Sequence, residues 1–582
     1  MKHRLLFVFA LALLADAGAA AWTNIGPFGG EARSLASDAS GNTVFVVNRR
    51  TGVSRSTGGG TWTLVFDAVG RGVTPTRVAV DPQTSRVYVG TTTGLYRSDD
   101  SGLTWRLLPT DPIIDVTASG DRVIVSTPMG LLRSGDAGAT WLAIDSPPSD
   151  VQTVVTLVRI DPRAIERVAA VIAGNLFFSG DLGRDWTQLN PTNVVALTFG
   201  DVLYAGGSNG VYVCESDCTR VGMDPVVDIA YWRSLLYAAI NDGVLLLGPP
   251  WQRLINGFPN AAMLALLATP PALFAGTTAG VYVTTDGAQW KNRSDGLTNV
   301  RITGIAAAGE SLFASTAGQG VMQRSATTWI DADIGLPINP PASPIARVLA
   351  SDGTTLYAGF LVDGLFRSTN FGATWDNVSA GLPSRDVLDV AADGAVVIVA
   401  TGGGVARSTN RGGSWQTFKT FPGLLGSAVA VKGQIIAIGF VTTAYVTTDG
   451  GTTWQTKQLP ATISKIAIAG SRVVAATDQG IFVSTDTGWI GPTFAGSNVN
   501  AITAPGSRIF ASITAATSTE SERPSGIYFS DDGMTWLLVP GSDALPKDVT
   551  VLSNDNAFLY AGTNGGSIFA SPLSTRRRAV NR

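Results

Sequence analysis

The chain has 582 residues, with 41 Lys and Arg against 44 Asp and Glu, and it is rich in glycine, with 67 residues. This length exceeds what one ordinary hydrophobic core organises, so at least two domains are expected. A nearly neutral chain lacks the broad positive field that captures nucleic acid or an anionic membrane, so we predict no nucleic-acid partner.

The first 21 residues are typical of a secretory signal peptide. Lys2 and Arg4 precede the apolar run 5–14, and small residues fill 17–21. The run is too short to cross a bilayer, so we expect cleavage near its end and export to the periplasm, the cell surface or the medium. No later stretch of sequence has the ~20 uninterrupted apolar residues of a membrane helix, so we predict no membrane span.

The single histidine of the chain, His3, lies within this signal segment. The mature protein is therefore expected to have none. This excludes Ser-His-Asp and Cys-His catalysis, His-ligated zinc and imidazole acid–base chemistry.

A short phrase, Ser-x-Asp-x-Gly-x-Thr-Trp, returns along most of the chain. Each copy follows two apolar runs that are separated by a small residue. Self-similarity at a spacing of about 40 residues indicates a propeller or solenoid built from one supersecondary unit. In chain order the copies occupy 98–105, 134–141, 179–186, 284–290, 368–375, 408–415, 447–454 and 530–536.

Each copy predicts the hairpin between the third and fourth strands of a four-stranded unit. The Asp or Asn side chain would accept hydrogen bonds from nearby backbone N–H groups, and Gly would take the positive φ that the turn needs. Trp would then open the fourth strand and pack its ring against neighbours. We expect structural roles at nine such positions: Asp100, Asp136, Asp181, Asp286, Asn370, Asn410, Asp449, Asp486 and Asp532.

Degenerate copies bring the count to about fourteen repeats. The last repeat, near 549–571, stops without a fourth strand, and the fifth has Cys214 and Cys218, the only two cysteines, where its box should be. In an oxidising compartment these cysteines can form a disulfide that staples the turn. A redox-active pair is the alternative, although such pairs usually have C-x-x-C spacing at a helix start.

Closed propellers carry four to eight blades, so fourteen repeats predict an all-β fold of two seven-bladed rings. Residues 21–24 look like an isolated fourth strand, and pairing them with the last repeat would remove two open sheet edges. We therefore expect an N-terminal ring at 22–256 plus 545–575, a second ring at 257–544 and a solvated basic tail at 576–582. One open ring, or rings of six and eight blades, would follow from a miscounted repeat.

The repeated phrase resembles the Asp-box, or bacterial neuraminidase repeat, over nearly the whole mature chain. Such boxes occur in sialidases, sortilin-type receptor ectodomains, a photosystem II assembly factor and two-propeller xyloglucan-degrading glycoside hydrolases. The resemblance implies a β-propeller with the boxes on hairpins around the outside of the blades. A sialidase is not expected, because the Arg-Ile-Pro segment is absent and glutamate is scarce.

The two-propeller xyloglucanases look similar in architecture and in the opening stretch 22–30. In that family two aspartates, one from each propeller, act as general base and general acid, and the first follows the second strand of the first blade. The corresponding segment here, 46–52, contains Arg49 and Arg50 but no carboxylate. The resemblance therefore implies a departure at the catalytic base, and we assign no catalytic residue.

Other carboxylates outside the boxes could in principle hydrolyse glycosides, which requires two carboxyl groups about 5 to 10 Å apart. The candidates are Asp115, Asp228, Asp389 and Asp393. The first three lie near predicted strand starts, where Asp is common for reasons of turn formation, so a structural role is expected for each.

Two functions remain. The first is an exported, non-enzymatic binding or scaffold protein that recognises a protein or glycan partner through its propeller faces, with the polar insertion 514–525 as one candidate contact. The alternative is a secreted glycoside hydrolase that acts on polysaccharide in the cleft between two propellers. We expect no cofactor, and no metal either, because no run has the spacing of a known Ca²⁺ loop. Candidate aromatic contacts on inter-blade loops are Phe28, Trp232, Phe258, Phe360 and Phe371.

Overall fold

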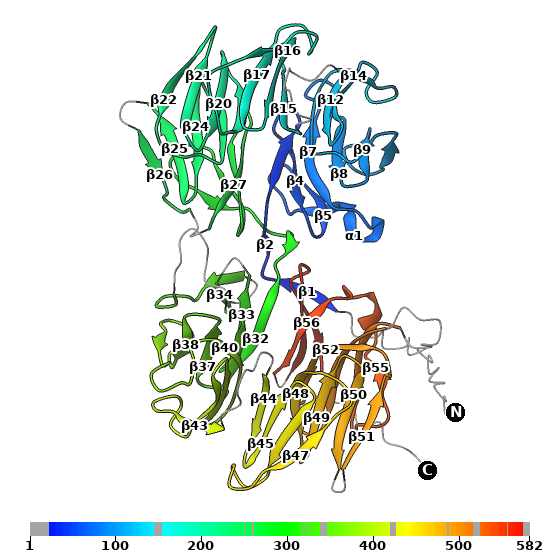
Figure 1. Cartoon of the computed structure of the whole chain (residues 1–582), viewed down its shortest axis with the longest axis vertical. Coiled ribbons are helices and arrows are strands. Elements are labelled where there is room, and N and C mark those ends of the chain that lie inside the picture. Colours follow the sequence, from blue (N-terminus) through cyan, green and yellow to red (C-terminus); the bar gives the residue numbers. More distant parts are fainter. Residues whose placement is uncertain are drawn as a thin grey trace, which may run out of the picture. The chain divides into compact units, whose positions relative to one another are not determined.

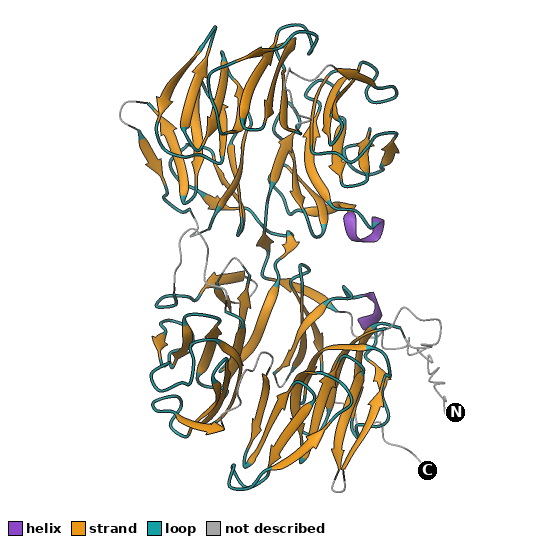
Figure 2. Ribbon diagram, in the orientation of Figure 1, coloured by secondary structure: helices purple, strands orange, loops and turns teal. Residues whose placement is uncertain are grey.

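The computed structural model describes residues 22–144, 154–248, 251–258, 261–317, 320–325, 328–337, 346–419, 427–485, 488–515, 524–555 and 557–573. The expected signal segment, the basic tail 576–582 and Asp486 lie outside these residues. Regular structure in the described part is almost entirely strand (Figure 2), with one short helix, α1 (Ala68–Arg71), and one 3₁₀ turn (Ser542–Ala544). Among the described residues no helix is long and apolar enough to cross a membrane.

Fourteen four-stranded antiparallel sheets make up the described chain, which is the architecture of tandem β-propellers. Each sheet is a meander of consecutive strands, apart from the sheet that the N-terminal strand completes. The second and third strands are buried on both faces because each sheet packs between its neighbours, as in Val87–Thr91, while the outermost strand Arg106–Leu108 is largely exposed. This explains why the middle strands read as continuous apolar runs.

The first seven sheets form a closed ring. Their innermost strands contact one another in sequence, and β27 returns to contact β3. The strands, sheet by sheet, are β3 (Ser34–Ser37), β4 (Thr43–Asn48), β5 (Gly52–Thr57), β6 (Thr63–Asp67); β7 (Pro75–Val80), β8 (Val87–Thr91), β9 (Gly94–Ser98), β10 (Arg106–Leu108); β11 (Asp115–Ser119), β12 (Arg122–Thr127), β13 (Gly130–Ser134), β14 (Leu142–Ile144); β15 (Val155–Asp161), β16 (Ala164–Ile172), β17 (Asn175–Ser179), β18 (Thr187–Gln188); β19 (Val194–Phe199), β20 (Leu203–Gly207), β21 (Gly210–Cys214), β22 (Cys218–Gly222); β23 (Asp228–Trp232), β24 (Leu235–Ile240), β25 (Gly243–Leu247), β26 (Gln252–Leu254); and β27 (Met263–Ala268), β28 (Leu273–Thr277), β29 (Gly280–Thr284), β30 (Lys291–Asn292).

Closure of this ring corrects the expected partition, which had completed the first propeller with the C-terminal repeat. Trp62 of the first blade donates its backbone N–H to Asp295 O at 2.8 Å, and its indole N–H bonds Arg293 O just after β30. The seven consecutive repeats therefore close on themselves without a borrowed strand. The first propeller spans 34–292 in its sheets, and the boundaries 22–256 plus 545–575 do not hold.

The remaining seven sheets supply the second propeller, and its last sheet is completed by the N-terminal strand, in the order β1-β58-β57-β56. Figure 1 shows blue β1 with the red C-terminal strands. The expected pairing of the first strand with the last repeat is therefore present, but in the other propeller. The strands are β32 (Ile302–Ala308), β33 (Ser311–Thr316), β34 (Val321–Ser325), β35 (Thr328–Asp331); β36 (Val348–Ser351), β37 (Leu356–Phe360), β38 (Gly364–Ser368), β39 (Asp376–Asn377); β40 (Val387–Asp393), β41 (Val396–Thr401), β42 (Gly404–Ser408), β43 (Gln416–Lys419); β44 (Ser427–Lys432), β45 (Ile435–Phe440), β46 (Thr443–Thr447), β47 (Gln455–Gln458); β48 (Ile463–Ala469), β49 (Arg472–Thr477), β50 (Gly480–Thr485), β51 (Gly488–Thr493); β52 (Asn498–Thr503), β53 (Ile509–Thr514), β54 (Gly526–Ser530), β55 (Leu537–Leu538); and β56 (Val549–Asn554), β57 (Phe558–Thr563), β58 (Ile568–Pro572), β1 (Thr23–Gly26).

Two short strands outside the blades accompany the passage of the chain between propellers. β2 (Gly29–Gly30) and β31 (Thr298–Asn299) pair in parallel, with Gly29 opposite Thr298. Each lies between the last strand of one propeller and the first strand of the other in the sequence. The two connections therefore run side by side.

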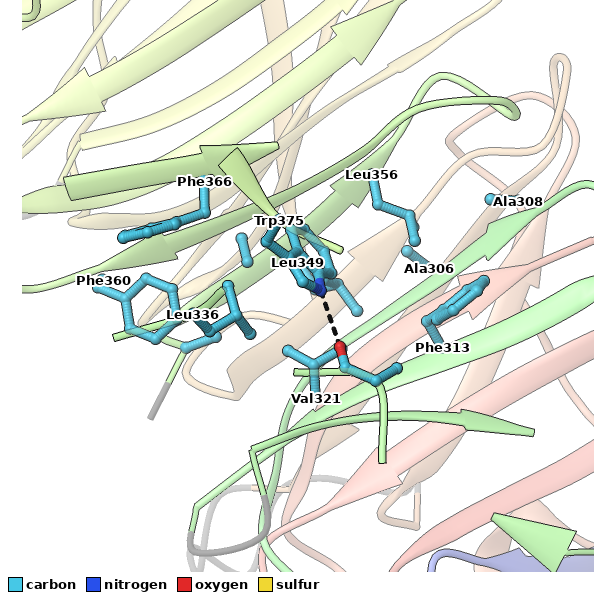
Figure 3. Packing of buried hydrophobic residues seen from close by; sticks show 13 residues of the cluster. Ala306, Ala308, Phe313, Val321, Leu336, Leu349, Leu356, Phe360, Phe366 and Trp375 are labelled. Carbon is cyan, nitrogen blue, oxygen red and sulfur yellow. Dashed lines mark hydrogen bonds between the residues drawn. The ribbon is translucent and has the colours of Figure 1, made fainter. Parts of the chain in front are cut away.

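The hydrophobic core is distributed between neighbouring sheets. In the cluster drawn in Figure 3, Phe313, Leu356 and Trp375 come from three different strands or hairpins and are all less than 5% exposed. A dashed line in the same view joins the Trp375 indole to the backbone of the preceding blade, where Nε1 donates to Ala332 O at 2.7 Å. Trp105, Trp290 and Trp415 donate to the preceding blade in the same way, so these box tryptophans belong to the interfaces between blades.

Candidate functional site

The two ends of each sheet carry different chemistry. We call the end with the first–second and third–fourth hairpins the box edge; in the second blade it comprises 81–86 and 99–105. The opposite end, comprising 92–93 and 109–114 in that blade, we call the loop edge. Because the blades repeat, corresponding segments of all blades of one propeller share an edge.

At the box edge, the Asp side chain of each box accepts the hydrogen bonds of a turn. Asp100 Oδ1 accepts from Ser98 Oγ at 2.7 Å and from Thr104 N at 2.8 Å, while Oδ2 accepts from Thr104 Oγ1 at 2.6 Å. Gly102 follows at a φ of 90° and donates its N–H to Ser98 Oγ. Serine or threonine and backbone donors surround the carboxylates of Asp136, Asp181, Asp286, Asp449 and Asp532 in the same way.

Asparagine supports the same turn. Asn370 Oδ1 accepts from Ser368 Oγ and Thr374 N, and its amide donates to Thr374 Oγ1. Asn410 has the equivalent three bonds. The hydroxyl simply changes from donor to acceptor, so the turn needs the oxygen of the side chain and not its charge.

Hydrogen bonding to the ionised form lowers the pKa of the box aspartates. The Thr104 hydroxyl is the main cause for Asp100, and the Thr140 hydroxyl for Asp136; each carboxyl pKa falls to about 2. The Gln289 backbone N–H does the same for Asp286. These side chains are therefore ionised acceptors at neutral pH, which suits a turn former and not a general acid.

Arginine, which the sequence analysis did not single out, is the second repeated feature of the box edge. Arg97 Nη1 donates to Ala137 O in the box of the next blade at 2.7 Å, and Arg55 and Arg367 make the same bond to Ser101 O and Arg411 O. The accepting residues all have positive φ. A signal was present in the sequence, because arginine stands directly before the first box residue in several repeats.

A disulfide replaces the box in the fifth blade. Cys214 and Cys218 face each other across strands β21 and β22, and their sulfur atoms are bonded. The three residues between them form the turn, in which Glu215 N bonds Asp217 O. The covalent bond thus stands at the position where a carboxylate network closes the other hairpins.

Two of the four carboxylates outside the boxes lie on innermost strands of the first propeller. Asp115 is 1% exposed, with Arg77 Nε on one oxygen at 2.7 Å and Arg159 Nη1 on the other at 2.7 Å. The second oxygen also accepts from Val158 N of the next blade. Despite desolvation, the two guanidiniums hold the pKa of Asp115 below its usual value.

Asp228 is bound differently. One oxygen accepts from Leu266 N of the next blade at 2.8 Å and the other from Ile229 N. Its burial raises the carboxyl pKa. Both aspartates therefore join neighbouring blades, which is a different structural reason from the turn formation that was expected.

Asp389 and Asp393 both lie on β40 in the second propeller. Asp389 is buried, whereas Asp393 is exposed at the end of the strand. Two other carboxylates emerge from the structure at the end of β35. Desolvation by the surrounding atoms raises the pKa of Asp331 and of Asp333, and Asp331 adds to the effect on its neighbour. The Asp331 side chain is nevertheless exposed, and Asp333 is half-buried.

The loop edge of the first propeller exposes large apolar side chains. Four of them, from different inter-strand segments, are more than half exposed: Val69 (71%), Met129 (75%), Met223 (75%) and Ile255 (52%). A fifth, Val195 (55%), is the second residue of β19 at the same end of its sheet. At the box edge of the same propeller two described side chains exceed half exposure: Leu103 (69%) within a box and Leu142 (64%) at the start of β14. Exposed apolar surface is therefore concentrated at the loop edge.

The aromatic residues proposed as contacts are mostly interior. Trp232 and Phe360 are 4% and 2% exposed, and Phe258 packs against the Tyr282 and Trp290 rings. Phe28 is half-buried, while Phe371 is 44% exposed in a box. Of the insertion 514–525, residues 516–523 lie outside the described part; its ends are joined by Ala515 N bonding Ser525 Oγ.

Basic residues occupy the β4–β5 hairpin at the loop edge. Asn48 Oδ1 accepts from Arg50 N and Thr51 N, which fixes Arg49 and Arg50 at the tip of the hairpin. Ala68 N, at the start of α1, donates to Thr51 O, so the helix lies beside this tip. No group of three or more His, Cys, Asp or Glu among the described residues could hold a metal ion.

No family model matches the chain, and no curated protein matches it in sequence. Solved structures do match. A GH74 xyloglucanase from Xanthomonas campestris is 16% identical, with a TM-score of 0.69 over 95% of this chain and 100% of that one. An ancestral GH74 enzyme is 15% identical, with a TM-score of 0.69 over 96% and 99% of the two chains.

A third similar structure is PorZ, a bacterial surface component of the type-IX secretion system of Porphyromonas gingivalis. It is 14% identical, with a TM-score of 0.59 over 96% of this chain and 88% of PorZ. At these identities the likeness concerns the fold and not the activity. The chain therefore has a tandem β-propeller fold that is similar both to glycoside hydrolases and to a secretion-system component.

Proposed function

We propose that the chain is an exported, non-enzymatic β-propeller protein that binds a protein or glycan partner outside the cytoplasm. The observation that carries this proposal is the concentration of exposed apolar side chains, Met129 and Met223 foremost, on the loop edge of the first propeller. Large apolar residues gathered on one face are typical of surfaces that contact another molecule.

The state of the described carboxylates supports the same proposal. The described box aspartates each accept three or four hydrogen bonds within their turns, as Asp100 and Asp181 do. Asp115 accepts from two arginines and a backbone N–H. Groups held in this way serve the fold, so we assign structural roles to the box positions and to the disulfide. Arg49 and Arg50 stand where the xyloglucanase resemblance would require a base.

Export follows from the sequence of the first 21 residues. An oxidised Cys214–Cys218 pair agrees with an exported protein, because disulfides persist in oxidising compartments.

A second candidate function, polysaccharide hydrolysis, is favoured by one observation. Asp331 and Asp333 have raised carboxyl pKa values, and a raised pKa is what a general acid needs. Glycoside hydrolysis also requires a second, ionised carboxylate at a suitable distance, and this role has no assigned residue.

The test is hydrolysis of a polysaccharide panel, with xyloglucan and other β-glucans foremost, by the purified mature protein, measured as new reducing ends. A binding protein produces none. Reducing ends that appear with the wild type and disappear with both Asp331→Asn and Asp333→Asn would replace the binding proposal by the hydrolase. Asp376→Asn, an exposed change on the outermost strand β39, is the matched control.

A further inference from the structure

We propose that the loop edge of the first propeller docks an acidic protein segment that also carries apolar side chains. The inference rests on the proposed binding function and names the chemistry of the partner. Its centre is a basic patch that we define as Arg49, Arg50, Val69 and Arg71.

The basic patch is built from two adjacent segments. Arg49 and Arg50 occupy the tip of the β4–β5 hairpin, and Val69 and Arg71 belong to α1, which follows β6. The bond from Ala68 N to Thr51 O, at 3.1 Å, ties the two segments together. All four residues are exposed.

The guanidiniums of the basic patch keep donors available. Arg50 Nη1 bonds the neutral amide oxygen of Asn564 at 3.2 Å, and Arg71 lies over the rings of Phe66 and Tyr96 at 5.0 and 5.5 Å. Neither contact neutralises a charge. The structure gives Arg49 no side-chain hydrogen bond or ion pair with any described residue, whereas Arg33 nearby is paired with Glu31.

One carboxylate, Asp67, lies at the start of α1. Its oxygen accepts from Gly70 N at 3.0 Å as the cap of the helix, so it is used within the turn. The three arginines of the basic patch and this one carboxylate give a local net charge of +2. A partner of opposite charge is therefore favoured, both in the rate at which it meets the surface and in its orientation.

The exposed apolar side chain within the basic patch favours a protein partner over a glycan. Val69, which is 71% exposed, belongs to the basic patch, whereas Met129, Val195, Met223 and Ile255 lie on the same edge in other blades. Sugar rings stack on exposed aromatic rings, but Phe66 and Tyr96, beneath Arg71, are buried.

The experiment measures fluorescence anisotropy of labelled peptides with the full mature protein at low and at physiological salt. The probes are a Glu/Leu peptide, a Glu/Ser peptide and a Lys/Leu peptide of equal length. The expected result is binding of the Glu/Leu peptide only, weaker at higher salt, with Arg49→Glu and Val69→Ser each raising Kd by about tenfold.

Arg184→Glu, an exposed charge reversal in a box, is the matched control and should change Kd by less than about twofold. Equal binding of the Lys/Leu peptide, or an equal effect of Arg184→Glu, would overturn the proposal. Polygalacturonate that binds at Arg49 while the Glu/Leu peptide does not would also overturn it, in favour of an acidic glycan. None of these results bears on the hydrolysis assay, so the proposed non-enzymatic function is tested separately.

Discussion

The box edge and the loop edge of the first propeller use the same residue types in opposite ways. At the box edge, Asp100 and Arg97 are committed to the turn and to the next blade, where the arginine meets the backbone of the following box. At the loop edge, Arg49 and Met223 extend from short connections and leave their polar or apolar groups exposed. A repeat protein can therefore place the residues that stabilise its fold at one end of every sheet. The connections at the other end are then free to vary and to contact other molecules.

Removing a box Trp should have the largest effect on stability. Trp375→Ala deletes a ring that is 4% exposed together with its bond to Ala332 O, so the free energy of unfolding should fall by about 3–5 kcal/mol. Urea unfolding, followed by fluorescence and circular dichroism, measures it. Leu103→Ala, which is 69% exposed in another box, should stay within about 0.5 kcal/mol. Similar losses for both variants would contradict the role given to the Trp.

Asp115 lies near the loop edge, and we expect it to stabilise the fold. Asp115→Asn leaves the half-buried Arg77 and Arg159 without their counter-charge, so the free energy of unfolding should fall by about 2–4 kcal/mol. Asp228→Asn should cost less, because that carboxylate is held by backbone N–H groups and burial already raises its pKa. The reverse order in urea unfolding would show that the arginines do not depend on Asp115.

The disulfide should contribute an intermediate amount to the free energy of unfolding. Replacing both Cys214 and Cys218 by serine opens a covalent loop with a sequence separation of 4, for which loop entropy gives about 2 kcal/mol. Reduction of the wild type with dithiothreitol should shift the urea midpoint by the same amount as the double substitution. A double variant as stable as the oxidised wild type would mean that the hairpin needs no staple.

Acid should weaken the turns of the box edge. The folded pKa of Asp100 is lowered from 3.8 to about 2, so its contribution to stability is complete above its ordinary value and is lost as the pH falls towards 2. Asp100→Asn should keep the turn, as Asn370 does, and should make the urea midpoint less dependent on pH between 5 and 2. An unchanged pH dependence would show that the carboxylate is not involved.

Much of this fold is predictable from the sequence because the box has local chemistry. Gly102, Asp100 and Trp105 each have a role within a few residues of one another, and the repeat count follows from them. The closing blade was misassigned because closure depends on which strand packs on β3, a contact between residues more than 200 positions apart. Arg97 and the Asp115–Arg159 pair were missed for a similar reason, since their partners lie in the next blade.

A matched pair of arginines distinguishes most sharply between a box edge that is structural and a loop edge that is available for contact. Urea unfolding of Arg97→Gln and Arg49→Gln, measured side by side, compares a guanidinium bonded to the next blade with one exposed at a hairpin tip. We expect the free energy of unfolding to fall by about 1.5–3 kcal/mol for Arg97→Gln and by less than about 0.5 kcal/mol for Arg49→Gln. Equal losses of stability, or a larger loss for Arg49→Gln, would contradict this distinction between the two edges.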